Sequence, residues 1–348
     1  MHWKRSEQTI IMNGVLFLHS ITLENRLMDN HPRGTNPYRV TAAKKASSSV
    51  APFTFAFHSI AHEGHPERNE DTILVDRGRG LASVFDGVGG VSAGEIASQL
   101  AARVISQAWS HTLQHQQPQN SSDLLVLHDD LDIQVLVHQL LEEAQSAISD
   151  EGDRRVKAAA TTPEQVTYPA TTAIVAVLCQ HPGKKGYVMG YAHAGDSRIY
   201  LLRRDEPLQR LTRDDGYFLL KMQDQTLSED DAFRIDQATH IDQLSETERA
   251  IFGKRNGITQ RLGHFTPKAP SLTIHTAQTV IAPGDRILLC SDGIHDNLTD
   301  AEIETIVRCG AHTVVARHLV QRALDRSREE CLRAKKDDMT AIVITCNY

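Results

Sequence analysis

Cysteine is scarce in this chain of 348 residues. The five cysteines stand far apart and never form a C-x-x-C pair. A disulfide framework needs an even, closely spaced set, so the pattern excludes a small disulfide-rich domain. The cysteines fit reduced thiols, and we therefore expect a cytoplasmic protein.

Long apolar runs are also missing. A transmembrane helix needs about 20 consecutive apolar residues. The most apolar segment, residues 10–21, contains Asn13, His19 and Ser20, and no convincing cleavage site of a signal peptide follows it. We expect no association with a membrane.

The chain has no excess of basic charge. Its 37 Lys and Arg residues face 44 Asp and Glu residues, which gives a formal net charge of -7. Affinity for duplex nucleic acid depends on Lys and Arg side chains that neutralise phosphates. The sequence shows no concentrated basic stripe. We therefore expect no nucleic-acid partner.

The composition is that of a packed globular protein. Hydrophobic residues make up 40% of the chain, which also has 21 glycines. Residues 1–52 are rich in polar and turn residues and predict a poorly ordered N-terminal extension. Patterned segments begin at Phe53, so the sequence predicts one domain over residues 53–348.

Short apolar and β-branched runs between turn signals predict strands. These runs are 81–85, 171–178, 187–192, 199–202, 287–290 and 339–345. Hairpin-like turns link many of them, which indicates mainly antiparallel sheets. Together with the helices described next, this predicts an α+β protein.

Helix starts are marked by capping boxes, in which a Ser or Thr and a Glu three residues later satisfy first-turn backbone groups. Two occur, at 92–95 and 299–302, and an amphipathic pattern over 131–149 predicts a third helix. The segment 214–256 is long for a connection, is charged, and carries further helix starts at Ser228 and Ser245. We expect it to form a flap.

Aspartates stand beside glycine at the ends of several predicted strands. A single such aspartate is usually an ordinary turn residue. Aspartates stand at five such strand ends, three of them with an adjacent glycine: 69–71, 86–90, 195–198, 291–293 and 336–340. If the strands converge, these carboxylates repel one another unless cations lie among them, and oxygen-only ligands select Mg²⁺ or Mn²⁺. The sequence therefore predicts a metal site that is inactive when no metal ion is bound.

The motifs at these places follow one order along the chain. They are Asn-Glu-Asp at 69–71, Asp-Gly-Val-Gly-Gly at 86–90, Gly-Asp-Ser-Arg at 195–198, Ser-Asp-Gly at 291–293 and Asp-Asp-Met-Thr at 337–340. Over about residues 53–346 the chain resembles the bacterial form of the PP2C (PPM) family of metal-dependent serine/threonine protein phosphatases. The resemblance implies a four-layer α-β-β-α sandwich of two antiparallel sheets flanked by helices, with the active site at one edge. It also implies a monomer.

The resemblance implies a role for each carboxylate. Asp86 and the backbone carbonyl of Gly87 match the group that bridges two metal ions, and Asp292 and Asp337 match further ligands of one of them. Two such ions activate a bridging hydroxide that attacks phosphoserine or phosphothreonine in proteins. The implied cofactors are two Mn²⁺ or Mg²⁺ ions.

Three more carboxylates complete the implied metal site. Glu70 and Asp71 match residues that hold the second ion, and Asp196 matches a weaker third-metal site of bacterial relatives. The implied partners are phosphoproteins, including a Ser/Thr kinase and its substrates.

The sequence departs from the family pattern at several positions. An Arg that grips the substrate phosphate is replaced by Pro66, and Arg68 lies two residues later, on the same face of an extended segment. Arg68 is either the phosphate contact or a surface arginine. Val88 stands in place of a proposed general acid, so we assign none.

Three further positions near the motifs leave alternatives open. Asp338 stands where an Asn is usual, and either tightens cation binding or faces solvent. Asp215 stands where a His is common, and His295 is interpreted as a turn residue rather than a catalytic one.

Two functional alternatives to a protein phosphatase remain. One is a pseudophosphatase, a regulatory binding module that keeps the fold without turnover, and the other is a phosphatase for small phosphate esters. A decayed site usually loses a carboxylate, because clustered acids destabilise a fold that no longer binds metal. The five carboxylates Glu70, Asp71, Asp86, Asp292 and Asp337 are all present, which favours catalysis.

Overall fold

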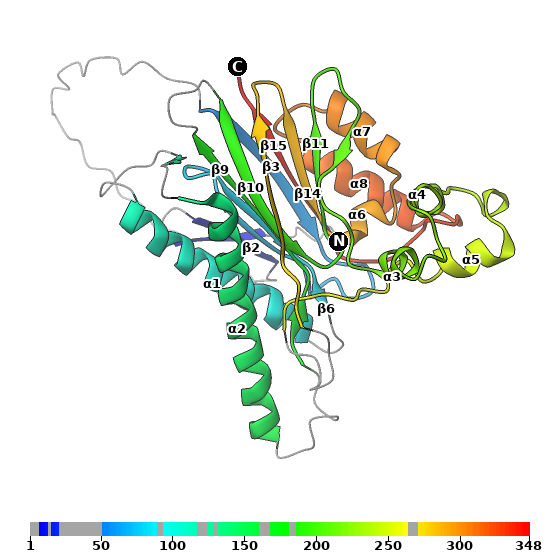
Figure 1. The fold of residues 1–348 in the computed structure, drawn as a ribbon, viewed down its shortest axis with the longest axis horizontal. Helices are drawn as coiled ribbons and strands as arrows, with labels where there is room; N and C mark the ends of the chain where they lie inside the picture. Colours follow the sequence, from blue (N-terminus) through cyan, green and yellow to red (C-terminus); the bar gives the residue numbers. More distant parts are fainter. Residues whose placement is uncertain are drawn as a thin grey trace, which may run out of the picture.

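Two antiparallel sheets lie face to face between two layers of helices in the computed structural model (Figure 1). The structure describes residues 7–12, 15–20, 51–88, 93–116, 124–127, 131–159, 168–180, 186–263 and 271–348. The α-β-β-α sandwich predicted from the sequence is confirmed.

The first sheet has eight strands, seven of them in the order β1-β2-β4-β5-β9-β10-β13, with β7 paired to β9. β7 runs parallel to β9, and the other pairs are antiparallel. The strands are β1 Glu7–Met12, β2 Val15–Ser20, β4 Thr72–Asp76, β5 Leu81–Phe85, β7 Leu125–Val126, β9 Ala173–Gln180, β10 Tyr187–Ala194 and β13 His275–Ile281.

The second sheet has five antiparallel strands in the order β12-β11-β14-β15-β3. They are β3 Phe53–Ile60, β11 Arg198–Leu202, β12 Gln209–Arg210, β14 Arg286–Cys290 and β15 Met339–Cys346. A separate pair joins β6 Gly87–Val88 to β8 Ala170–Thr171.

Helices cover the outer face of each sheet, and a third group lies to one side (Figure 1). The helices on the first sheet are α1 Ala93–Gln116 and α2 Ile133–Ala159; those on the second are α6 Asp292–His295, α7 Asp300–Cys309 and α8 Val315–Ser327. The side group is α3 Tyr217–Gln223, α4 Glu229–Asp236, the 3₁₀ turn η2 Ile241–Gln243 and α5 Glu246–Phe252. This side group lies in the predicted flap, residues 214–256.

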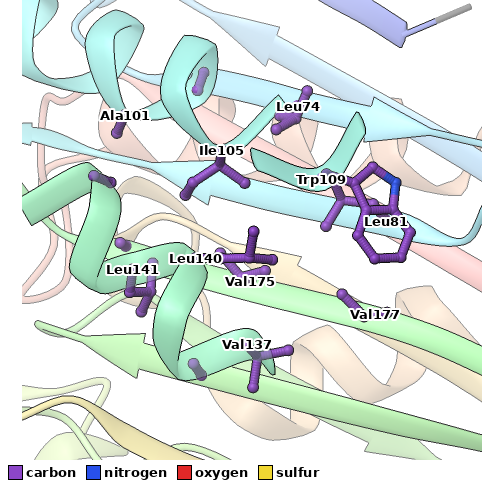
Figure 2. Packing of buried hydrophobic residues seen from close by; sticks show 14 of the residues in the cluster. Leu74, Leu81, Ala101, Ile105, Trp109, Val137, Leu140, Leu141, Val175 and Val177 are labelled. Atoms are coloured by element: carbon purple, nitrogen blue, oxygen red, sulfur yellow. The ribbon is translucent and has the colours of Figure 1, made fainter. Parts of the chain in front are cut away.

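Three hydrophobic cores fill the spaces between the four layers. Trp109 of α1, Leu140 of α2 and Val175 of β9 belong to the core beneath the first helix layer (Figure 2). Ile199 and Leu289 belong to the core between the sheets, and the third lies under α7 and α8. Because apolar burial on this scale stabilises each interface, the sheets form a rigid frame for the residues at their ends.

The helix starts predicted from the sequence agree with the structure where it describes them. Thr299 caps α7 and Ser245 caps α5, each with a complete capping box, and Ser228 caps α4. The predicted helix over 131–149 is longer, because α2 continues to Ala159. The start at Ser92 lies outside the described residues.

Part of the N-terminal segment differs from the predicted poorly ordered extension. β1 and β2 form a hairpin, and β2 pairs with β4 through the registers Leu16↔Val75, Phe17↔Leu74 and Leu18↔Ile73. Residues 21–50 lie outside the described residues.

Across the segments that the structure describes, no helix is both long and apolar enough to cross a membrane.

Candidate active site

The predicted acidic residues lie at one end of both sheets because of the strand registers. In the first sheet Thr72 pairs with Phe85, so Asp71 and Asp86 leave the sheet together. In the second sheet Cys290 pairs with Ala341, so Asp292, which begins α6, lies near Asp337, which precedes β15. Residues more than 200 positions apart thereby meet at one edge of the sandwich.

The predicted carboxylates lie close enough for their charges to act on one another. Burial raises the pKa of Asp86 well above its ordinary value, and the charges of Asp292, Asp71, Asp337 and Asp196 raise it further. Asp86 therefore lies within the field of four other acidic groups. Such a cluster of buried and partly buried carboxylates is costly unless cations compensate its charge.

Hydrogen bonds fix Asp71 between the two sheets. The Ser291 hydroxyl donates to Asp71 Oδ2 at 2.8 Å, and Thr340 N donates to Ser291 Oγ at 3.1 Å. On the other side Asp71 N donates to Asn69 Oδ1 at 2.9 Å. Ser291 was not identified from the sequence as a functional residue, because only its neighbour Asp292 carries a charge.

Glycines follow two of the site aspartates because backbone atoms approach closely there. A Cβ at Gly87 would lie 2.5 Å from the carbonyl carbon of Gly94 in α1, and one at Gly293 would lie 2.0 Å from Asp338 O. Gly87 N also donates to Glu70 O at 3.2 Å. The glycines thus allow the motifs that carry Asp86 and Asp292 to pack against the segments that carry the other acids.

A lysine lies inside the acidic cluster. Lys335 Nζ contacts the Asp292 carboxylate, lies 2.7 Å from Asp296 Oδ2, and lies 3.0 Å from Asp337 Oδ2. Burial opposes its charge, but the charges of Asp292, Asp296 and Asp337 outweigh burial and hold the pKa of Lys335 well above its ordinary value. Lys335 is therefore an ammonium ion, and it was not identified from the sequence.

The donor set fits a hard divalent cation. Asp71 Oδ1 and Asp292 Oδ1 are buried and accept no hydrogen bond, and unsatisfied buried carboxylate oxygens favour a cation ligand. In the part of the chain that the structure describes, no three His, Cys, Asp or Glu side chains already stand in a metal-binding arrangement. The predicted ligands therefore lie near one another, but their side chains do not yet surround a single point.

The family model for protein phosphatase 2C matches residues 60–335. The chain belongs to the protein phosphatase 2C family. The family and the enzyme class predicted from the sequence are thereby confirmed. The matched span contains every predicted site residue except Asp337.

Two curated relatives agree with this assignment. A putative protein phosphatase 2C-type protein of Streptococcus pyogenes is 28% identical over 243 residues, which are 69% of this chain and 78% of that protein. The serine/threonine protein phosphatase PstP of Mycobacterium tuberculosis is 30% identical over 256 residues, which are 74% of this chain and 39% of PstP.

A solved structure shows the same fold. The catalytic domain of PstP in complex with two manganese ions superposes with a TM-score of 0.56 at 22% identity, over 85% of this chain and 99% of that domain. The predicted requirement for two Mn²⁺ or Mg²⁺ ions agrees with the manganese-bound state of PstP.

Two departures from the protein phosphatase 2C pattern lie at the edge of the site. Arg68 Nη2 lies 3.3 Å from Glu70 Oε1, and its side chain is 32% exposed. Asp338 is buried and accepts from His62 N and from Glu70 N, both at 2.6 Å. Asp338 therefore does not face solvent; it holds the segment that carries Arg68 and Glu70.

Asp196, the predicted third-metal residue, is also buried in the cluster. Burial and the charge of Asp292 raise its pKa well above the ordinary value. His295 Nε2 lies 3.0 Å from Asp196 O, and burial lowers the pKa of His295 to about 4, so this imidazole is neutral. His295 is thus a buried residue at the end of α6 that contacts the Asp196 backbone, rather than the predicted turn residue.

Asp215, where many protein phosphatase 2C members have a His, is buried as well. It accepts from Gly195 N at 3.0 Å and lies 3.0 Å from His275 Nε2. Through its bond to Gly195 N, Asp215 therefore holds the Gly195-Asp196 turn in place.

Residues of the segment 214–256 help to line a polar pocket beside Asp196. The pocket is lined by Asp196, Arg198, Asp214, Gly216, Phe218, Asp236, Arg255, His295 and Asp296. Its floor is a buried ion-pair network in which Arg198 Nη2 lies 2.6 Å from Asp214 Oδ2 and 3.3 Å from Asp236 Oδ2. The network was not predicted, because its members have no common sequence motif.

Proposed function

We propose that this protein hydrolyses phosphoserine and phosphothreonine in proteins with the help of two Mn²⁺ or Mg²⁺ ions. The observation that carries the proposal is the convergence of Asp71, Asp86, Asp292 and Asp337 at the ends of two sheets, in the order of the family motifs.

The ligand roles follow from the motifs and the positions of their side chains. Asp86 and the carbonyl of Gly87 would be shared by the two ions. Asp292 and Asp337 would complete one ion, and Glu70 and Asp71 the other. Asp196 would hold a third, weaker ion. When bound, the ions supply a nucleophilic water at neutral pH and neutralise charge on the phosphoryl oxygens.

The chain's own side chains position the substrate and the ligands. Arg68 is the cationic side chain next to Glu70, and its guanidinium fork suits a phosphate. Asp71 is held by Ser291, so its free oxygen Oδ1 keeps one direction. No side chain is assigned as the acid that protonates the leaving oxygen.

The relatives support phosphoproteins as substrates. PstP is named as a serine/threonine protein phosphatase. A protein Ser/Thr kinase would supply the phosphorylated substrates of this chain, and the domain would act as a monomer because its cores are closed within one chain.

The test is release of phosphate from a phosphothreonine peptide by the full chain, with Mn²⁺ and with EDTA. Asp292→Ala is expected to lower turnover at least about 100-fold, because it removes a ligand of the cluster. Asp230→Ala, an exposed aspartate of α4, is the matched control and is expected to change nothing. Turnover of p-nitrophenyl phosphate alone would point to small esters, and Mn²⁺ binding without turnover of either substrate would point to a pseudophosphatase.

A further inference from the structure

Lys335 is largely buried against three carboxylates of the site, two of which are assigned above as ligands of one ion. Its side chain is 17% exposed, and its ammonium lies between Asp292 and Asp337. A divalent cation that binds both aspartates needs the same space and the same negative charge. The inference that follows rests on the proposed function.

The position of Lys335 is fixed by the fold rather than by a free loop. Lys335 N donates to Asn297 Oδ1, and Asn297 Nδ2 donates to Lys335 O, both at 2.9 Å. Asn297 is fully buried and also donates to Gly293 O at 2.9 Å. The backbone of Lys335 is thereby tied to α6, the helix that Asp292 begins.

The charges around Lys335 are unequally shared. Asp296 has a second cationic partner, since Arg255 Nε lies 3.4 Å from Asp296 Oδ1. With its amide oriented to satisfy both groups, Asn256 donates to Asp296 Oδ2 at 2.9 Å and accepts from Lys335 Nζ at 3.3 Å. Asp292 and Asp337, in contrast, share the Lys335 ammonium. The Lys335 ammonium can thus remain paired with the buried Asp296 carboxylate when Asp292 and Asp337 bind an ion.

We propose that Lys335 is a built-in counter-ion that competes with the divalent cation for Asp292 and Asp337. Before an ion binds, the ammonium neutralises this pair and stabilises the metal-free chain. When an ion binds, the ammonium gives up Asp292 and Asp337 and remains paired with Asp296. Lys335 therefore weakens the affinity of this ion and sets the metal concentration at which the site fills.

The experiment compares Lys335→Gln with Lys336→Gln in the full chain. Lys336 is the exposed neighbour, so it controls for the loss of one positive charge near the site. Mn²⁺ binding to metal-stripped protein is measured by titration calorimetry, and the melting temperature is measured in EDTA. Lys335→Met, which is also neutral, and Lys335→Arg, which keeps the charge, separate the effect of charge from that of shape.

The proposal expects that Lys335→Gln and Lys335→Met bind Mn²⁺ at least about tenfold more tightly than the natural chain, because close charge pairs are coupled this strongly. Their melting temperature in EDTA is expected to fall by about 2 °C or more. Lys336→Gln and Lys335→Arg should stay near the natural chain in both measurements. A neutral variant that folds only when Mn²⁺ is present also supports the proposal.

Equal or weaker Mn²⁺ binding in the neutral variants would overturn this inference and leave the proposed function standing. Binding of Mn²⁺ only by the neutral variants would support the role of Lys335 and overturn the two-metal function of the natural chain. No Mn²⁺ binding by any variant would overturn both.

Discussion

Asp338 holds in place the chain segment that carries Arg68, and both residues depart from the family pattern. The resemblance to the family predicts that Pro66 stands where a phosphate-binding arginine is usual, and Arg68 lies beside Glu70. The segment is held in place because Asp338 accepts from the backbone of His62 and Glu70. An Asn at position 338 has one acceptor oxygen in place of two, so it cannot accept both bonds through separate oxygens in the same way.

Arg68→Ala is expected to lower kcat/KM for a phosphothreonine peptide about tenfold or more, mainly through KM, because a charged contact with the phosphate is lost. Arg68→Lys should recover part of the loss, since it keeps the charge but not the fork. Steady-state kinetics check this, with the exposed Arg204→Ala as control. Unchanged kinetics in Arg68→Ala would make Arg68 a surface arginine.

His193 is a buried residue whose protonation state affects stability. Its ring stacks on His275 with centroids 4.8 Å apart. Burial, and then the charge of His275, lowers the pKa of His193 to about 4. The unfolded chain keeps a pKa near 6.5 at this position, so the folded state favours the neutral ring. The stability that neutral His193 gives to the folded state is fully present above about pH 6.5 and is lost as the pH falls toward about 4.

The free energy of unfolding should therefore fall more steeply with decreasing pH in the natural chain than in His193→Gln. The difference in slope is at most about 1.4 kcal/mol per pH unit between about pH 6.5 and 4.5. Urea unfolding in EDTA at several pH values measures both slopes. Parallel slopes would show that His193 does not titrate with folding.

At the scale of elements, the flap is attached to the frame by charge. Asp236 at the end of α4 accepts from Arg198 of β11 and from Arg210 of β12, and Arg333 donates to Asp236 O. Burial would raise the pKa of Asp236, but the charges of Arg198, Arg210 and Arg333 outweigh burial and hold it well below the ordinary value. The flap also has a small core of its own, which includes Ile235 and Phe252.

Asp236→Asn should destabilise the protein by about 3–5 kcal/mol, because it leaves Arg198 as an under-compensated buried charge. In Asp236→Asn, the amides of α4 and α5 should exchange with solvent faster than those of β14. Urea unfolding and hydrogen exchange measure the two effects. Asp230→Asn, on an exposed position of the same helix, is the control, and equal losses in both variants would contradict the anchoring role.

At the scale of the whole molecule, the N-terminal hairpin covers an edge of the first sheet. β2 pairs with β4, the strand that directly follows Asp71. An uncovered edge strand exposes unpaired backbone groups that recruit other chains. The hairpin thus belongs to the sheet although the family motifs begin after it.

A variant that begins at residue 51 should keep its phosphatase activity within a few-fold, because the acidic cluster and the core residues whose side chains the structure describes lie beyond that point. The amides of β4 should exchange faster, and the variant should self-associate more at high concentration. Hydrogen exchange and light scattering measure this. Unchanged exchange in β4 would show that the hairpin does not pair there in solution.

The sequence by itself determined the family and the layer order, and it predicted the set of site carboxylates. Each motif has an aspartate at a strand end, in three of the five beside a glycine, and the strands carry β-branched runs that can be recognised locally. The cytoplasmic location and the individual ligand roles stay predictions.

Only the tertiary structure decided which charges meet. Lys335 and Asp292 are 43 residues apart, and Ser291 and Asp71 are 220 apart. Arg198, Asp236 and Arg333 are similarly distant in the chain. In the sequence Lys335 and Arg333 resemble surface residues, and the motifs that contain Ser291 and Arg198 do not indicate their partners. Its partner is set by strand register and sheet packing, which depend on contacts along the whole chain.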